Sequence, residues 1–158
     1  MSNHQSTLTA VGLQKRYGSR TVVTEVGVEV KSGEVVGLLG PNGAGKSTTL
    51  EIIETLREKT SGTVMVNGFD LDKSPESIKK MIGVQLQTAG FYPNLNLTEL
   101  IHLFVGLYQN EMDADTLLQK VNLQDKAKAK FKELSGGQKQ RFSIATTLIN
   151  KPKIIFLD

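Results

Sequence analysis

The sequence predicts an α/β protein with a parallel-sheet core, and two apolar stretches of the chain carry this prediction. Glu34 to Leu39 is a compact apolar run between glycines, as in a buried parallel strand, and helical spacing over Lys46 to Leu56 follows the next glycine-rich turn. Ile154 to Leu157 is a second such run, and it ends on Asp158. A carboxylate at the carboxyl end of a parallel strand lies where α/β sheets bind their ligands.

Antiparallel strands are expected ahead of this core. Leu8 to Val30 alternates short β-branched runs with glycines, which is typical of antiparallel strands joined by turns. Thr63 to Val66 and Met81 to Val84 are predicted as further strands. Between them lies a short helix that Ser74 caps and Pro75 begins.

The second half of the chain has helical patterns. Apolar spacing predicts two helices from Thr98 to about Phe131 and a last helix from about Gly136 to Asn150, which Pro152 ends. The apolar faces expected for the first two helices consist of Leu100, Leu103, Phe104 and Leu107, and of Leu117, Leu118 and Val121.

Composition limits the classes of protein and of site. The 158 residues suit one domain with its own core. The chain has no cysteine and two histidines, which excludes disulfides and thiolate zinc sites and disfavours a histidine metal cluster. No apolar run approaches the roughly 18 residues that span a bilayer, and Met1 to Thr7 has no apolar signal core, so we expect a cytoplasmic protein.

The net charge of +3 does not predict a nucleic-acid partner. Lysines and arginines are spread along the chain, and a solvated surface explains them better than a binding patch does. The densest basic stretch, Lys126 to Lys132, alternates with alanine and is interpreted as one exposed helix face.

A glycine-rich turn with the full phosphate-loop pattern G-x-x-x-x-G-K-S/T follows the first predicted parallel strand. Glycines let successive N–H groups converge on phosphates, and the helix that starts near Lys46 directs its positive dipole end at the same charge. Lys46 is expected to reach the β- and γ-phosphates, and the Ser47 hydroxyl to bind Mg²⁺. A turn that only caps a helix would explain the glycines but not the Lys-Ser pair. The candidate nucleotide-binding residues are Gly40, Pro41, Asn42, Gly43, Ala44, Gly45, Lys46, Ser47 and Thr48.

The last predicted helix starts with a second motif, Leu134-Ser135-Gly136-Gly137-Gln138. By itself this is a serine N-cap with a tight glycine entry to a helix. The pentapeptide is identical to the signature motif of the ATP-binding cassette (ABC) ATPases, and with the phosphate loop it makes the chain similar to that family from Leu8 onward. The resemblance implies an ABC-type phosphate-loop NTPase with an N-terminal antiparallel β subdomain, a parallel-sheet core and a helical subdomain.

The resemblance also implies further binding and catalytic residues. Ser135 and the glycines of the signature, with Gln138, would contact the γ-phosphate held by a second subunit, as the family's signature serine and glycine do. Gln87 falls where the family's Q-loop glutamine contacts the metal and the attacking water, with Gln85 as an alternative. Asp158 resembles the Walker B aspartate, which holds Mg²⁺ directly or through water. The candidate catalytic residues are Lys46, Gln87 and Asp158, and the candidate metal ligands are Ser47, Gln87 and Asp158.

Tyr17 falls where the family stacks an aromatic ring on adenine, and stacking of this kind tolerates any base. A surface tyrosine in a turn is the alternative explanation. The resemblance therefore makes Tyr17 a candidate nucleotide-binding residue.

Gln87 to Tyr108 resembles the ATPase subunits of bacterial drug-export and antibiotic-resistance ABC systems, whose helical subdomain takes up a coupling helix of the membrane subunit. The resemblance divides the single domain 1–158 into a catalytic core with the β subdomain, about 8–86 and 135–158, and a helical subdomain, about 87–134. It implies ATP and Mg²⁺, a permease partner that holds the protein at the inner face of the cell membrane, and a second ATPase subunit in a head-to-tail dimer.

Two other interpretations stay open. A soluble ABC ATPase that acts on DNA or ribosomes has the same core motifs, although this chain shows neither tandem cassettes nor zinc-binding cysteines. The third interpretation, besides the transporter subunit and the soluble ATPase, is a nucleotide-binding fragment without turnover. In the family, the catalytic carboxylate, the D-loop and the switch histidine follow the position that corresponds to Asp158. We therefore expect these 158 residues to bind ATP without hydrolysing it, and to lack the C-terminal strand that separates the two predicted parallel strands.

Overall fold

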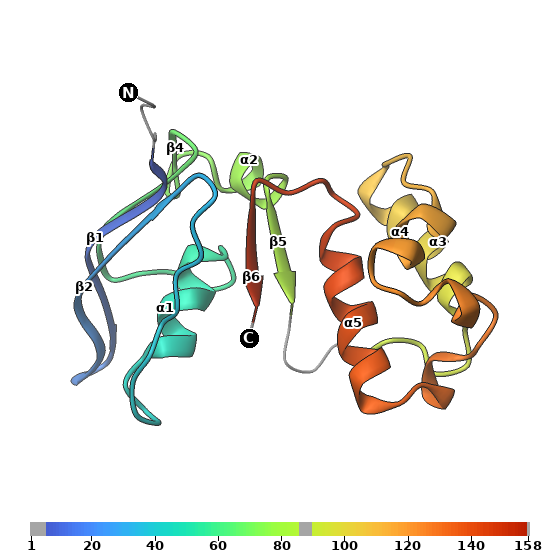
Figure 1. The fold of residues 1–158 in the computed structure, drawn as a ribbon. Coiled ribbons are helices and arrows are strands. Elements are labelled where there is room, and N and C mark those ends of the chain that lie inside the picture. Colours follow the sequence, from blue (N-terminus) through green and yellow to red (C-terminus); the bar gives the residue numbers. More distant parts are fainter. Residues whose placement is uncertain (1–5, 86–89, 158) are drawn as a thin grey trace. The chain divides into compact units, whose positions relative to one another are not determined.

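The computed structural model describes residues 6–85 and 90–157. They form two compact units, with the boundary in the sequence between Lys80 and Met81 (Figure 1). The first unit contains an antiparallel sheet and the second a parallel pair of strands with helices, so the predicted α/β class is confirmed. The division into a core and a helical subdomain at residues 87 and 134 stays a prediction.

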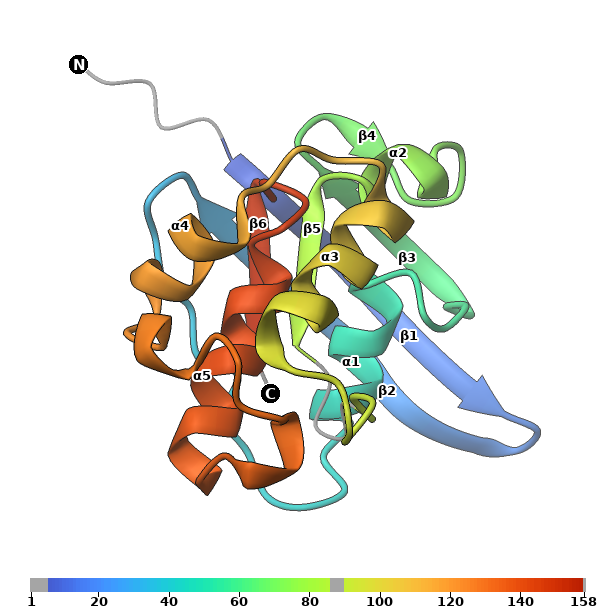
Figure 2. The same cartoon turned by 90° about the vertical axis from the view of Figure 1, so that its right-hand side faces the viewer.

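The first unit is built on a four-stranded antiparallel sheet (Figure 2). Its strands are β1 (Ser6–Tyr17), β2 (Arg20–Lys31), β3 (Ser61–Val66) and β4 (Phe69–Asp70). Their order is β2-β1-β3-β4, and a tight turn joins β1 to β2, since Tyr17 pairs with Arg20. Along β3, Val64 and Val66 are buried while Met65 is exposed. This alternation places one face of the sheet in the core.

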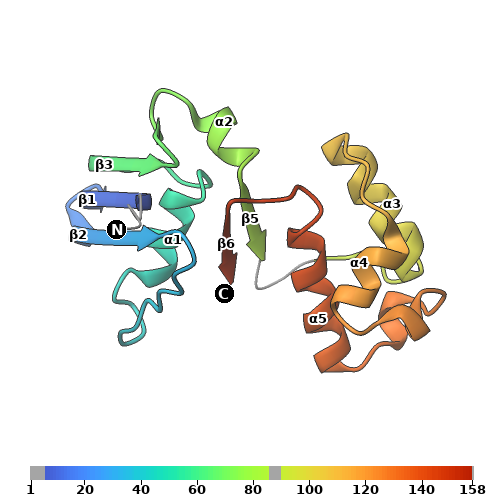
Figure 3. The same ribbon diagram turned by 45° about the horizontal axis from the view of Figure 1, so that its top comes forward.

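Two helices belong to the first unit, α1 (Lys46–Ile53) and α2 (Pro75–Lys79). The first packs against β1 and β2 and buries Ile52 and Ile53 (Figure 3). The second begins at Pro75 with Ser74 as its N-cap, as predicted. The buried apolar residues of this unit are Leu8, Ala10, Leu13, Val23, Ile52, Ile53, Val64, Val66, Leu71 and Ile78.

The second unit combines a parallel pair of strands with a group of helices. In chain order it contains β5 (Ile82–Gln85), α3 (Leu97–Tyr108), α4 (Ala114–Lys120), the 3-10 helices η1 (Gln124–Lys126) and η2 (Phe131–Glu133), α5 (Gly136–Thr147) and β6 (Ile154–Leu157). The pairing of β5 with β6 runs from Ile82 and Ile154 to Gln85 and Leu157, so both strands end at the same edge. In the part of the chain that the structure describes, no helix has the length and apolarity to span a membrane.

Gly83 lets α5 pack closely on β5. A Cβ at this position would lie 2.6 Å from the backbone carbonyl oxygen of Thr147. The helix ends there, short of the predicted Asn150. The chain then returns to β6, where the N–H of Lys153 donates to the carbonyl of Met81 at 2.7 Å. The start of β6 is thereby fixed beside the start of β5.

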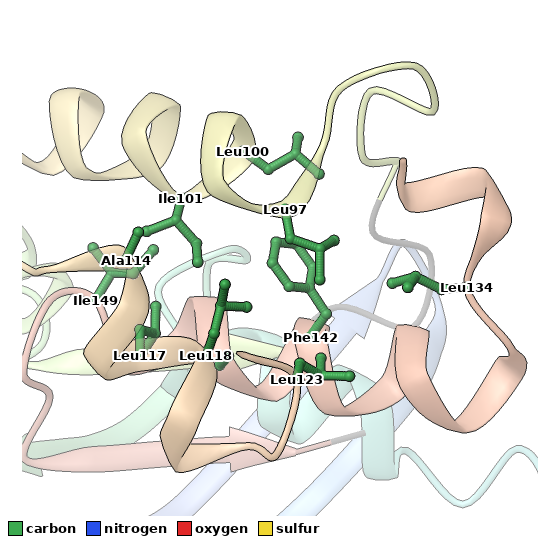
Figure 4. Packing of buried hydrophobic residues seen from close by; sticks show 11 residues of the cluster. Leu97, Leu100, Ile101, Ala114, Leu117, Leu118, Leu123, Leu134, Phe142 and Ile149 are labelled. Atoms are coloured by element: carbon green, nitrogen blue, oxygen red, sulfur yellow. The ribbon is translucent and has the colours of Figure 1, made fainter. Parts of the chain in front are cut away.

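Three helices enclose one apolar cluster (Figure 4). Ile101 of α3, Leu117 and Leu118 of α4 and Phe142 of α5 are all fully buried in it. Phe91 packs against the cluster, and its ring centroid lies 5.2 Å from that of Phe142 in an edge-to-face arrangement. The predicted burial of the two leucines of α4 is confirmed.

The strand predicted for Glu34 to Leu39 is not formed. No described strand pairs with this stretch, and the side chains of Val35 and Leu39 are 97% and 93% exposed. An apolar run becomes a strand only when a neighbour satisfies its backbone N–H and C=O groups.

The buried stripe of α3 starts one residue earlier than predicted, because Asn96 caps the helix with a capping box and Leu97 is its first residue. Counting from Leu97 at helical spacing places Ile101 inside and Leu107 outside. Ile101 is fully buried, whereas Leu103 is 37% and Leu107 is 70% exposed. The prediction that Leu103 and Leu107 face the core is therefore wrong.

The basic stretch Lys126 to Lys132 is not one helix face, contrary to prediction. Part of it is extended and forms a β-bridge between Lys130 and Asn96. The carbonyls of Ala127 and Ala129 accept hydrogen bonds from the first turn of α3, both at 3.2 Å, and their side chains pack on the apolar cluster. The alanines lie in a turn that follows η1, with the N–H of Ala129 donating to the carbonyl of Lys126 at 2.9 Å, so the alternation of lysine with alanine reflects a turn packed on the cluster rather than a helix face.

Replacing Ile101 by Ala should lower the free energy of unfolding by about 2–5 kcal/mol, because the change leaves a cavity between α3 and α4. Leu107→Ala is the matched control in the same helix, and its effect should stay within about 0.5 kcal/mol. Chemical denaturation measures both values. Equal losses for the two variants would contradict the buried face assigned to α3.

Candidate functional site

The phosphate-loop residues form an open turn at the start of α1. Gly45 is the N-cap, with a φ of 85°, and no described side chain caps the helix. The residues before it, from Pro41 to Ala44, are exposed. The first N–H groups of a helix have no partner within the helix and lie at its positive dipole end, so this uncapped start has the donors that fit a phosphate group.

Gly45 is the position in this turn that excludes a side chain. A Cβ there would lie 2.5 Å from the backbone carbonyl oxygen of Val22 in β2 and 3.1 Å from a methyl carbon of Val23. Its positive φ also favours glycine. The glycine of the motif therefore sets the point at which the helix starts beside the sheet.

Lys46 folds back over the loop. Its Nζ donates to the carbonyl oxygens of Gly40 at 2.7 Å and Pro41 at 2.8 Å. Among the described residues it has no carboxylate partner. A partly exposed cation that is held by carbonyls alone is available to phosphate oxygens at the same place.

Ser47 and Thr48 follow in the first turn of α1. Ser47 is exposed and Thr48 is half-buried. Within residues 6–85 and 90–157, no group of three His, Cys, Asp or Glu side chains could hold a metal ion. An exposed hydroxyl beside a phosphate site fits Mg²⁺, which prefers phosphate oxygens, water and one or two protein ligands to a cage of carboxylates.

Ser135 caps α5 with a full capping box. The N–H of Gln138 donates to the Ser135 hydroxyl at 3.3 Å, and the N–H of Ser135 donates to the Gln138 side-chain carbonyl at 2.9 Å. The signature motif thus has the N-cap role that its sequence indicates.

Gly136 and Gly137 have no structural need to be glycine within the part of the chain that the structure describes. Both are exposed and lack a positive φ, and no described neighbouring atom lies within 4 Å of a Cβ built at either residue. Two bare residues at a helix N-terminus allow another molecule to approach the backbone N–H groups closely.

Tyr17 lies at the end of β1 with 44% of its surface exposed. Arg57, which follows α1, donates from its guanidinium to the Tyr17 hydroxyl and to the carboxylate of Glu51 at 2.7 Å. The ammonium of Lys15 lies over the Tyr17 ring, 5.0 Å from its centroid. The hydrogen bond to Glu51, and then the one to Tyr17, raise the pKa of Arg57 above its ordinary value. Arg57 therefore stays charged beside the ring.

Gln87 and Asp158 lie outside the described residues. The strands that precede them end at Gln85 and Leu157, which are register partners in the parallel pair. Gln85, the alternative to Gln87, is 5% exposed. The assignment of Gln87 as the glutamine that reaches a nucleotide stays a prediction.

A cavity of about 260 Å³ lies in the second unit, between β5, α3 and α5. Its apolar lining includes the rings of Phe91, Phe104 and Tyr108, and its polar lining includes Ser143 and Asn150. Tyr108 is 51% exposed, so the cavity adjoins exposed apolar surface.

Sequence reasoning located the phosphate loop and the signature but did not single out Arg57. The loop and Tyr17 both belong to the first unit, and Arg57 and Glu51 connect Tyr17 to α1. No local pattern in the sequence pairs residues so far apart, and Arg57 by itself has the pattern of an ordinary surface arginine. The signature belongs to the second unit.

Residues 23–158 match the protein family described as ABC transporter. The linearmycin resistance ATP-binding protein LnrL of Bacillus subtilis is 36% identical over 96% of this chain and 50% of its own length. The daunorubicin resistance ATP-binding protein DrrA3 of Streptomyces coeruleorubidus is 32% identical over 96% and 49%. The spermidine/putrescine import ATP-binding protein PotA of Haemophilus influenzae is 33% identical over 92% and 40%. The chain spans about half the length of the curated relatives it matches.

Solved structures have the same fold. A dimeric ATP-binding cassette in a post-hydrolysis state, bound to ADP and Pi, has a TM-score of 0.78 and 30% identity, covering 94% of this chain and 72% of that one. A structure described as the ATP-binding subunit of an ABC transporter has a TM-score of 0.79 and 29% identity, covering 94% and 64%. The comparison of folds and the comparison of sequences thus point to the same family.

Lys46→Ala should weaken the binding of Mg-ATP at least about tenfold, because backbone dipoles replace the charge of a lysine only in part. Lys79→Ala is the matched control, since it removes an exposed lysine of the same unit that pairs with Glu76. Calorimetric titration of both variants with Mg-ATP measures the change. Equal affinities of Lys46→Ala and the unmodified chain would remove the phosphate-loop assignment.

Proposed function

Because the chain belongs to the ABC transporter family, we propose that it is the ATP-binding and ATP-hydrolysing subunit of such a transporter, powering export through a partner membrane permease. The start of α1 is the observation that carries this proposal. An uncapped helix N-terminus with Lys46 held over the loop supplies the donors and the charge that a triphosphate needs.

The proposed site divides its tasks among a few side chains. Lys46 and the N–H groups from Gly40 to Thr48 hold the phosphates, and Tyr17 stacks on the adenine. Bound Mg²⁺ neutralises charge on the β- and γ-phosphate oxygens. Ser47, Gln87 and Asp158 are its proposed ligands, and Gln87 orients the attacking water.

We infer that two copies of the ATPase subunit share each nucleotide in a head-to-tail arrangement. Ser135, Gly136, Gly137 and Gln138 of one chain would complete the site at Lys46 of the other. The open space around the two glycines supports this arrangement, because no described neighbouring atom lies within 4 Å of a Cβ built at either one. A two-fold axis would relate the two chains in such a dimer, so each chain completes the site of the other.

The region after Gln87 is proposed to receive the permease. Tyr92, Leu107 and Tyr108 are 63%, 70% and 51% exposed, so this region has apolar surface available to a partner. The cavity beside Phe104 and Tyr108 offers room for an apolar side chain of a partner. Attachment at this surface would place the protein at the cytoplasmic face of the membrane.

Export is favoured over import because the Nod factor export ATP-binding protein I of Burkholderia orbicola is 36% identical to this chain, whereas the spermidine/putrescine import protein PotA is 33% identical. Because the spermidine/putrescine import protein is also a relative, uptake is the alternative direction of transport. Transport in membrane vesicles of known orientation, with the permease present, separates the two. A soluble ATPase that acts on DNA or ribosomes would not purify with a membrane subunit.

Mixing a Lys46→Ala chain with a Ser135→Arg chain should restore ATPase activity of the intact protein above that of either variant alone. Heterodimers would have one doubly damaged site and one site with both motifs intact, because each site takes Lys46 from one chain and Ser135 from the other. Steady-state ATPase assays at several mixing ratios measure the effect. Activity no higher than that of the separate variants would contradict shared sites.

Leu107→Ser with Tyr108→Ser should reduce transport while the affinity for Mg-ATP stays unchanged, because both side chains are exposed on α3 and neither belongs to the phosphate loop. Gln119→Ser, an exposed polar change on α4, is the control. Transport and nucleotide titration are measured on the same preparations. Loss of both properties together would indicate unfolding rather than lost coupling.

A further inference from the structure

The end of β1 is held by the segment that follows α1. The ammonium of Lys15 donates to the carbonyl of Glu58 at 2.5 Å, and the N–H of Arg16 donates to the hydroxyl of Thr60 at 3.0 Å. Arg57 of the same segment donates to the hydroxyl of Tyr17. Three successive residues of β1 therefore bond to residues 57–60.

The side chain of Arg57 bonds both to a residue of α1 and to the aromatic residue at the end of β1. Its Nε donates to Glu51, which belongs to α1, and its NH1 donates to Tyr17. A planar guanidinium directs its donors along fixed lines, so the two bonds together fix where the Tyr17 hydroxyl lies relative to α1. The guanidinium carbon of Arg57 also lies 5.7 Å from the centroid of the Tyr17 ring, and the tyrosine stays 44% exposed.

We propose that Arg57 is a positioning residue for the nucleotide base: with Glu51 it locks the Tyr17 ring in the orientation that stacks on adenine. This inference rests on the proposed role of Tyr17 in nucleotide binding. A tyrosine on a turn loses rotamer freedom when a base stacks on it, and a ring that is already held loses less. The same contacts tie the ring to the helix whose first turn binds the phosphates, so base and phosphates meet one rigid assembly.

The Lys15 ammonium restricts the arrangement further. It lies over the Tyr17 ring and is itself held by the Glu58 carbonyl. The Arg57 guanidinium lies near the same ring, with its carbon 5.7 Å from the centroid. Both cations therefore hold the ring and limit the directions from which a base can stack on it.

Arg57→Gln should weaken the binding of Mg-ATP by about three- to tenfold, a part of what base stacking contributes. Binding of Mg-tripolyphosphate, which has no base, should stay within about twofold, because the phosphate loop is unchanged. Arg57→Lys should recover part of the loss. Arg20→Gln is the matched control, since Arg20 pairs opposite Tyr17 and makes no side-chain hydrogen bond with any described residue. Titration calorimetry on the full chain measures all of these affinities.

A double-mutant cycle tests whether Arg57 acts through the ring. Tyr17→Ala should weaken Mg-ATP binding, and adding Arg57→Gln to it should weaken binding no further. Multiplying losses would overturn the inference, and so would equal losses for ATP and tripolyphosphate or an unchanged ATP affinity of Arg57→Gln. If Tyr17→Ala has no effect while Lys46→Ala does, the inference fails and the phosphate site stands. If neither variant has an effect, the proposed function fails with it.

Discussion

The close approach of Gly45 to the Val22 carbonyl is the constraint on which the candidate nucleotide site depends. At 2.5 Å from that oxygen, a Cβ has no room, so α1 starts in contact with β2 and in one place. The uncapped N–H groups, the Lys46 side chain and the Ser47 hydroxyl all take their positions from this start. Glu51 lies further along the same helix and accepts a hydrogen bond from Arg57, which also donates to Tyr17. The positions of Arg57 and Tyr17 therefore also depend on where α1 starts.

In the second unit, α5 has a comparable structural role. Its first residues carry the signature, its middle places Phe142 in the apolar cluster, and its last turn packs on β5 at Gly83. A single helix therefore joins a candidate ligand-binding end to the parallel strands. Its capping box fixes the start of the helix without using the N–H groups of the two signature glycines.

The sequence allowed prediction of most of this architecture wherever a local signal was present. The phosphate loop, the Ser135 cap and the strand at Ile154 to Leu157 follow from residue type and spacing over a few positions. Prediction failed where a distant partner decides. Glu34 to Leu39 has the composition of a strand but no described neighbour, and the buried face of α3 is set by its packing with α4 and α5.

The contact between Arg57 and Tyr17 is also decided by tertiary structure and not by a local sequence signal. Their positions are separated by α1 and by the whole of β2, and neither residue type is unusual at its place. Gln87 and Asp158, which resemblance identified, lie outside the described residues. Their assignment still rests on the motifs around them.

The parallel pairing of β5 with β6 has a consequence for the order in which the chain folds. The hairpin of β1 and β2 needs a turn of a few residues, whereas β5 can pair with β6 only after α3, α4 and α5 have been made. Contacts between distant parts of a chain form slowly, because a long loop must close first. During synthesis from the N-terminus, the edge of β5 that pairs with β6 therefore stays unpaired until β6 has been made, and an unpaired strand edge can pair with another chain.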